Sequence, residues 1–222
     1  MTELFCQGLL FDMDGILISS LGSVERSWRA WALEHGVDPE LAIRTAHGCR
    51  AIETVRKLRP DLDDQAELRR IEAMEVADQE GVTALPGVPA LLASLPADRW
   101  TVVTSATERL ARVRLAAAGL AVPARFISAD QVAEGKPNPA PYLRGAELLG
   151  LNPADCLVVE DSGAGAIAGR AAGCTVLATL FSHTPEQLHA AHFLVGDLTA
   201  VQIVWQPEPS RFRVRFDPLP RS

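Results

Sequence analysis

The chain has 222 residues, of which 48% are hydrophobic, and its formal net charge is −7. This length allows one domain, or one domain with a small insert, around a sizeable core. The negative charge argues against a nucleic-acid-binding surface, which needs a basic stripe. No apolar run approaches the ~18 residues of a membrane span.

The chain reaches its first expected strand almost at once, so we expect no secretory signal. Its cysteines lack Cys-x-x-Cys spacing and are expected to be reduced thiols, which predicts a cytoplasmic protein. They are Cys6, Cys49, Cys156 and Cys174.

The first expected element is a strand at Leu4–Phe11. From Ser23 to Thr83, helix follows helix with no convincing strand. The helix signals are an end near Gly36, an N-cap at Asp38, a helix at Ala51–Leu58 and a longer helix from Asp63 to about Gln79.

Strands and helices alternate in the rest of the chain. The expected strands are Trp100–Thr104, Arg125–Ser128, Cys156–Val159 and Thr175–Leu180. The expected helices contain Val88–Leu95, Glu108–Ala118, Pro139–Leu149 and Gly163–Ala172. This alternation predicts an α/β fold with a doubly wound, Rossmann-like parallel sheet. An edge hairpin is expected from Val201–Trp205 and Phe212–Phe216. We expect residues 1–17 and 84–222 to form the core, and residues 18–83 an inserted α-helical cap.

The segment Leu9–Gly15 ends an apolar run in two acids, Asp12 and Asp14, with one residue between them. Successive side chains of a strand point to opposite faces, so core packing alone does not explain the pair. Gly15 lets the backbone turn sharply directly afterwards. Because open α/β sheets bind ligands at the carboxyl ends of their strands, the pair predicts a catalytic site.

Polar residues also follow other expected strands, namely Ser105, Lys136, Glu160 and Asp161. The rim would therefore carry four carboxylates against one lysine. Two unit charges ~4 Å apart repel by about 4 kcal/mol at an effective dielectric constant of 20. A divalent cation would relieve this repulsion, and oxygen ligands favour Mg²⁺. We expect Asp12, Asp161 and a backbone carbonyl near Asp14 to hold the ion.

This set of groups suits phosphoryl transfer. Asp12 would attack phosphorus and form an aspartyl-phosphate, while Mg²⁺ and Lys136 neutralise the phosphoryl oxygens. The Ser105 hydroxyl and the N–H of Ala106 would hold the remaining oxygens. Asp14 would protonate the leaving alkoxide and then deprotonate the attacking water.

Four motifs of the chain, in order, resemble those of the haloacid dehalogenase superfamily. They are Asp12-Met13-Asp14-Gly15, Ser105, Lys136-Pro137 and Glu160-Asp161. Finer features are similar to its hexitol-phosphate, glycerol-phosphate and 2-deoxyglucose-6-phosphate phosphatases, including His47-Gly48-Cys49-Arg50, Ala84-Leu85-Pro86-Gly87 and Gly135-Lys136-Pro137-Asn138-Pro139. The resemblance implies Mg²⁺-dependent hydrolysis of small sugar or polyol phosphates beneath a helical cap. The dehalogenases lack the second acid, so Asp14 favours a phosphatase.

His47 and Arg50 lie in a glycine-containing loop between two expected cap helices. The resemblance implies that both read the substrate, and guanidinium suits anionic or hydroxyl-rich ligands. A surface loop with incidental charge is the structural alternative. Glu160 is expected to support the neighbouring groups rather than bind the ion itself.

The chain departs from the phosphatase pattern at Ile16, where Thr is usual, so a hydroxyl that would orient Asp14 is missing. Related phosphomutases also have an apolar residue there, which leaves a sugar phosphomutase of the β-phosphoglucomutase type as an alternative. A catalytically silent binding protein on the same fold is a further alternative. The expected partner is a small phosphorylated sugar or polyol, with no nucleic acid or membrane. The chain is expected to be a monomer or a weak homodimer.

Other features have structural explanations. The glycines of Gly163–Gly169 are expected to pack a helix, since their spacing is one residue too long for a dinucleotide loop. Trp28 and Trp31 are expected in the cap core. The acid-rich helix Asp63–Glu80 is expected to be a solvated face.

Overall fold

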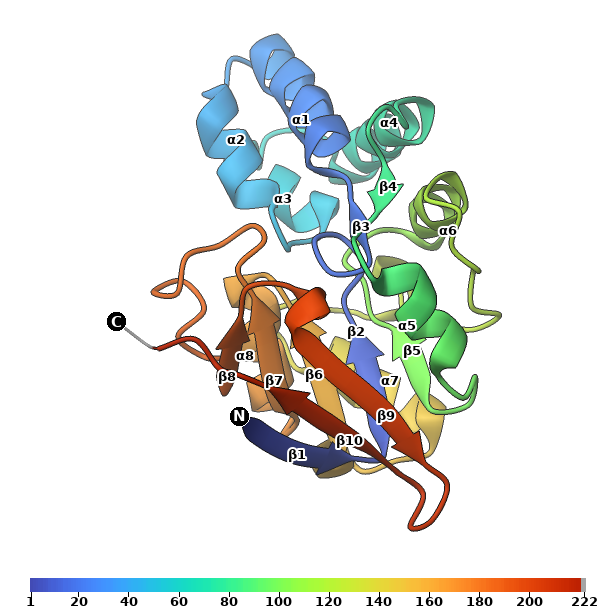
Figure 1. The fold of residues 1–222 in the computed structure, drawn as a ribbon. Helices are drawn as coiled ribbons and strands as arrows, with labels where there is room; N and C mark the ends of the chain where they lie inside the picture. Colours follow the sequence, from blue (N-terminus) through green and yellow to red (C-terminus); the bar gives the residue numbers. More distant parts are fainter. Residues whose placement is uncertain (221–222) are drawn as a thin grey trace.

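A computed structural model describes residues 1–220. Its centre is a five-stranded parallel sheet in the order β5-β2-β6-β7-β8 (Figure 1). The strands are β5 (Trp100–Val102), β2 (Gly8–Phe11), β6 (Cys156–Glu160), β7 (Thr175–Thr179) and β8 (Phe193–Val195). The predicted α/β fold with a parallel sheet is therefore confirmed.

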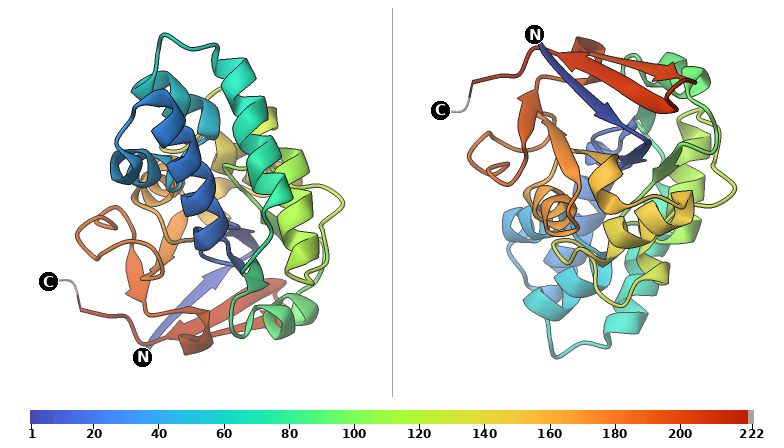
Figure 2. Two further views of the ribbon diagram at one scale, coloured as in Figure 1. Left: turned by 90° about the horizontal axis from the view of Figure 1, so that it is seen from above. Right: turned by 90° about the horizontal axis from the view of Figure 1, so that it is seen from below.

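Both faces of this sheet are covered, as the uninterrupted burial of β2 and β6 requires. On one face, α5 (Val88–Ser94) and α6 (Glu108–Ala117) pack against residues such as Leu9 and Phe11. On the other, α7 (Ala140–Leu149) and α8 (Gly163–Ala171) pack around Leu10 and its neighbours. Figure 2 shows α7 and α8 on the opposite side of the sheet from the C-terminal hairpin.

The strand predicted at Leu4–Phe11 is two strands in different sheets, which corrects that prediction. β1 (Thr2–Cys6) is alternately exposed and pairs antiparallel with β10 (Arg211–Phe216), whereas every residue of β2 is buried. The chain changes sheets at Gly8, where a Cβ would lie 2.5 Å from Leu151 Cδ1. A larger side chain would collide there with the loop that follows α7.

The predicted hairpin is present as β9 (Val201–Gln206) and β10. It does not extend the central sheet, because it joins β1 in a separate sheet of order β1-β10-β9. The inward side chains of β10 are Phe212, Val214 and Phe216.

The strand expected at Arg125–Ser128 is reduced to a single bridge between Val103 and Ile127. Strand β8 was not predicted, since three residues give too little pattern to recognise.

Four helices lie beyond the carboxyl ends of the central strands (Figure 1): α1 (Leu21–His35), α2 (Pro39–Ala46), α3 (Ala51–Leu58) and α4 (Asp64–Ala77). Asp38 caps α2 by accepting hydrogen bonds from the N–H groups of Glu40 and Leu41, as predicted. A separate apolar cluster fills the space between the four helices and includes Trp28 and Trp31, which confirms their place in this core.

Two short strands, β3 (Ile18–Ser19) and β4 (Thr83–Ala84), pair where the chain enters and leaves the helical segment. They were not predicted, and two residues each leave no periodicity to detect. The division into a core and a cap at residues 18 and 83 stays a prediction. Among residues 1–220, no helix combines the length and hydropathy that a membrane span requires.

Candidate active site

The candidate site is a cavity of about 290 Å³ between helices α1–α4 and the carboxyl ends of the central strands. Its lining includes all but two of the predicted site residues: Asp12, Asp14, His47, Arg50, Ser105, Ala106 and Asp161. The remaining two, Lys136 and Glu160, lie directly beside Asp12. The fold thus brings the predicted residues together.

Lys136 is the positive centre of the site and is 2% exposed. Its ammonium donates to Asp12 Oδ1 at 2.5 Å, to Glu160 Oε1 at 2.6 Å and to the carbonyl of Val103 at 3.0 Å. Burial alone would lower the pKa of Lys136, but the two carboxylates outweigh burial and raise it. The lysine therefore stays charged, with its three N–H groups all engaged.

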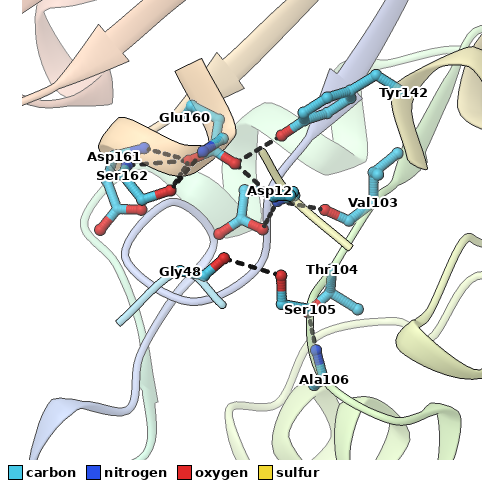
Figure 3. Close-up of polar contacts among 12 residues, drawn as sticks. Asp12, Gly48, Val103, Thr104, Ser105, Ala106, Tyr142, Glu160, Asp161 and Ser162 are labelled. Atoms are coloured by element: carbon cyan, nitrogen blue, oxygen red, sulfur yellow. Dashed lines mark hydrogen bonds and ion pairs between the residues drawn. The ribbon is translucent and has the colours of Figure 1, made fainter. Parts of the chain in front are cut away.

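Both carboxylate oxygens of Glu160 accept hydrogen bonds from surrounding groups (Figure 3). Its Oε1 also accepts from the Tyr142 hydroxyl at 2.6 Å, and its Oε2 accepts from the N–H groups of Asp161 and Ser162 and the Ser162 hydroxyl. Burial by itself would raise the pKa of Glu160, but Lys136 and these hydrogen bonds lower it. Glu160 is thus a fixed anion that orients Lys136.

Asp12, Glu160 and Asp161 each offer a carboxylate oxygen, and these oxygens lie within 4.8 Å of one another. Burial, together with the charges of the other two acids, raises the pKa of Asp161. Burial likewise raises the pKa of Asp12, which Lys136 opposes. A hard divalent cation would remove this repulsion, and oxygen donors are the ligands that Mg²⁺ prefers.

Gly15 leaves the room that this arrangement requires. It has φ +84°, and a Cβ there would lie 2.0 Å from Asp161 Oδ2. Only glycine permits both this backbone conformation and the close approach of the carboxylate. The residues present therefore fit a magnesium ion held by Asp12, Asp161 and the backbone near Asp14.

Asp14 is oriented by two donors. Its Oδ1 accepts from the Ser20 hydroxyl at 2.5 Å and from Arg114 Nη1 at 3.1 Å. Ile16 is 1% exposed and belongs to the apolar core. The two donors to Asp14 therefore come from α6 and from the residue before α1, and none comes from residue 16.

Ser105 and Ala106 follow β5 at the floor of the cavity. The Ser105 hydroxyl donates to the carbonyl of Gly48 at 3.0 Å, which joins the loop after α2 to the strand ends (Figure 3). The N–H of Ala106 donates to Thr104 Oγ1 at 3.1 Å. Both donors are thus engaged within the protein, and their contact with phosphate oxygens stays a prediction.

The loop after α2 closes tightly over the core. Gly48 has φ +73°, and a Cβ there would lie 2.6 Å from the Cβ of Ser162, which caps α8. The ring of His47 contacts that of His183, from the loop that follows β7. Burial lowers the pKa of His47, and its Nε2 has no hydrogen-bond partner among residues 1–220.

Arg50 lines the cavity, but its guanidinium is engaged elsewhere. It donates to the carbonyls of Val132 and Ala133 at 2.8 and 2.9 Å, and to Glu53. Glu53 in turn accepts from the N–H of Gly135 at 3.0 Å. The substrate contact of Arg50 stays a prediction, and the structure adds a second role: it ties α3 to the loop that leads to Lys136.

Three side chains of the site escaped sequence reasoning: Tyr142, Glu75 and Arg114. Glu75 is 5% exposed on α4, and its Oε1 lies 3.4 Å from Arg114 Nη2. Burial raises the pKa of Glu75 to about 7, although Arg114 opposes this shift. The prediction that the acids of Asp63–Glu80 form a solvated face is therefore wrong for Glu75.

A helical pattern could have revealed these buried charges. Arg114 lies four residues after Leu110, and Glu75 four residues after Ile71, so each charge shares a face with buried apolar residues. A charged residue on the apolar face of a helix is rarely left unpaired. The pattern indicates a pair but does not show which partner each charge finds.

Comparisons with known proteins identify relatives of this chain. The model of the haloacid dehalogenase-like hydrolase family matches residues 6–173. Hexitol phosphatase A of Escherichia coli (strain K12) is 42% identical over 91% of this chain and 96% of that protein. Glycerol-1-phosphate phosphohydrolase 2 of Saccharomyces cerevisiae is 36% identical over a region that covers 76% of this chain and 72% of that protein. The crystal structure of a hydrolase from Pseudomonas syringae has a TM-score of 0.76 and 25% identity, covering 87% of this chain and 96% of the other.

Proposed function

Because the chain belongs to the haloacid dehalogenase-like hydrolases, we propose that it is an Mg²⁺-dependent phosphatase for small sugar or polyol phosphates. The observation that carries the proposal is the cluster around Asp12, in which one buried lysine and two further acids lie beside a carboxylate that lines the cavity. The names of the two relatives, a hexitol phosphatase and a glycerol-1-phosphate phosphohydrolase, support the substrate class.

The ion would be held by Asp12, Asp161 and the backbone carbonyl near Asp14. When bound, Mg²⁺ would neutralise charge on the phosphoryl oxygens and act as a Lewis acid. Ser182 donates to Asp161 Oδ2 at 2.5 Å, so this carboxylate is already oriented toward the site. Glu160 stays committed to Lys136, Tyr142 and the N-terminus of α8.

Asp12 is the proposed nucleophile. One of its oxygens attacks phosphorus, the bond to the ester oxygen breaks, and an aspartyl-phosphate forms. Lys136 lies 2.5 Å from Asp12 Oδ1 and offsets the repulsion between this carboxylate and the incoming phosphate. The Ser105 hydroxyl and the Ala106 N–H would bind the remaining phosphoryl oxygens.

Asp14 is the proposed general acid and base. It gives its proton to the leaving alkoxide and then takes a proton from the water that hydrolyses the aspartyl-phosphate. The loop at Gly48 lies against Ser162 at the edge of the cavity. His47 and Arg50 would contact the sugar or polyol.

The first test is phosphate release from hexitol 6-phosphate and glycerol 1-phosphate, with and without Mg²⁺. We expect turnover with the metal, and a loss of at least ~10³-fold for Asp12→Asn, since the nucleophile is removed. Asp98→Asn, which changes an exposed acid, is the matched control and should behave like the wild type. Activity that survives Asp12→Asn in a clean preparation would contradict the assigned nucleophile.

Ile16 is the observation that favours the second candidate, a sugar phosphomutase. A mutase would return the phosphoryl group to a sugar hydroxyl rather than to water. Product analysis separates the two activities: free phosphate supports the phosphatase, and an isomerised sugar phosphate without free phosphate supports the mutase.

A further inference from the structure

Arg114 is a buried cation to which the proposed mechanism gives no part. It comes from α6, its side chain is 3% exposed, and it lies on the cavity wall. Nη1 contacts Asp14 Oδ1 at 3.1 Å, and Nη2 lies 3.4 Å from Glu75 Oε1 of α4. One guanidinium thus lies between an acid of the helical segment and the second acid of the Asp12–Asp14 pair.

The Arg114 guanidinium is buried, but its hydrogen-bond donors are not all paired with acceptors in the described part of the chain. Its Nε and Nη2 have no hydrogen-bond partner among residues 1–220, although both atoms are buried. Nη2 meets Glu75 only at ion-pair distance, 3.4 Å, so packing and pairing alone leave this guanidinium incompletely satisfied. Its one good hydrogen bond goes to Asp14.

We propose that Arg114 is a positioning residue that holds the Asp14 carboxyl toward the leaving group, and that Glu75 holds Arg114 in turn. The inference rests on the proposed function and adds the device that orients its acid. Ser20 supplies the second donor to the same oxygen, at 2.5 Å. Together they do the work of the hydroxyl that is absent at Ile16.

The Glu75–Arg114 pair also connects α4 of the helical segment to α6. Helices α4 and α6 lie side by side in both views (Figures 1 and 2), and Thr107 at the start of α6 donates to Glu72 of α4 at 2.5 Å. A shift of α4 away from α6 would separate Glu75 from Arg114. Orientation of Asp14 is therefore coupled to the position of the helical segment.

The consequence depends on the leaving group. As the Asp12–phosphorus bond forms and the ester P–O bond breaks, the departing alkoxide of a sugar or polyol takes the proton of Asp14. A p-nitrophenolate ion leaves without that proton, because it is stable as an anion near neutral pH. Loss of positioning should therefore harm alkyl esters selectively.

The experiment compares kcat/KM for glycerol 1-phosphate and p-nitrophenyl phosphate in the wild type, Asp14→Asn, Arg114→Met and Glu75→Gln. We expect Arg114→Met to lose ~10²-fold on the glycerol ester but only a few-fold on the nitrophenyl ester. In assays above pH ~7, where Glu75 is charged, Glu75→Gln should lose roughly tenfold on the glycerol ester alone. Asp14→Asn should show the same selectivity, and Arg114→Lys should recover part of the loss.

Arg112→Met is the matched control on the same helix, since Arg112 pairs with Glu108 near the surface. It should leave both rates unchanged. Equal losses on both esters, or none, in Arg114→Met and Glu75→Gln would overturn the positioning role; if Arg114→Met does not fold, the nearly isosteric Glu75→Gln decides alone. A wild type without turnover on either ester would instead overturn the proposed function, and this inference with it.

Discussion

Glu75 shows how one buried side chain makes stability depend on pH. Its pKa in the folded protein is about 7, against an ordinary 4.5, because burial disfavours its charged form. Below pH ~4.5 the group is protonated in both folded and unfolded states. Between these values only the folded protein keeps the proton, so stability falls as pH rises, and above pH ~7 the full penalty is present.

We therefore predict that Glu75→Gln, which mimics the protonated acid, removes this part of the pH dependence. The variant should gain stability relative to the wild type between pH ~4.5 and ~7, by about 3 kcal/mol at most. Urea unfolding of both proteins across this pH range measures the difference. A difference that stays constant with pH would show that the carboxyl titrates normally.

Gly48 tests how closely the loop after α2 must approach the core. Gly48→Ala brings a Cβ to within 2.6 Å of Ser162 and also strains the backbone at φ +73°. Gly81→Ala is a matched control, because Gly81 has φ +78° but open space around it. We expect both to lose about 1 kcal/mol from backbone strain, and only Gly48→Ala to lose phosphatase activity as well. Urea unfolding and phosphate release measure the two effects.

At the scale of elements, Arg50 and Glu53 join α3 to the loop at 129–135. Arg50 is 7% exposed and donates to the backbone carbonyls of Val132 and Ala133. The same loop leads directly to Lys136. The position of α3 therefore affects where the Lys136 ammonium lies relative to Asp12.

Arg50→Met should therefore destabilise the protein by about 1–3 kcal/mol, because it removes the guanidinium that donates to two loop carbonyls and to Glu53. Faster amide hydrogen exchange in residues 129–135 should accompany the loss. Lys57→Met, at an exposed position of the same helix, should change neither quantity. Unchanged slow exchange in residues 129–135 of the Arg50→Met variant would show that the contacts of Arg50 do not hold this loop in place.

For the whole molecule, the acid cluster predicts that Mg²⁺ stabilises the folded state. A ligand that binds only the folded protein adds RT ln(1 + [L]/Kd), about 2.7 kcal/mol at 100 times Kd. Thermal unfolding should shift upward with added Mg²⁺, and chelation should reverse the shift. Asp161→Asn should abolish the metal response, whereas Asp98→Asn should keep it; an unchanged midpoint in the wild type would contradict the metal site.

Sequence reasoning recovered much of the fold because the responsible signals are local. Hydrophobic periodicity and caps located α3–α8 to within a few residues, together with the end of α1 and the start of α2, and the alternation of strands and helices predicted the parallel sheet. It failed at Gly8, where one apolar run is divided between two sheets. It also missed β8, whose three residues are defined by pairing with β7 rather than by their own pattern.

The sequence by itself determined which residues gather at the carboxyl ends of the strands, because parallel topology brings motifs such as those at Asp12, Lys136 and Asp161 to one edge. Only the tertiary structure decided what holds them. Arg114 contacts Asp14, which lies 100 residues earlier in the sequence. Arg50 donates to a backbone carbonyl of the loop at 129–135, and Glu75 is buried rather than solvated. The reason is physical: strand order follows from local patterns, whereas the partner of a buried charge depends on which helices pack together.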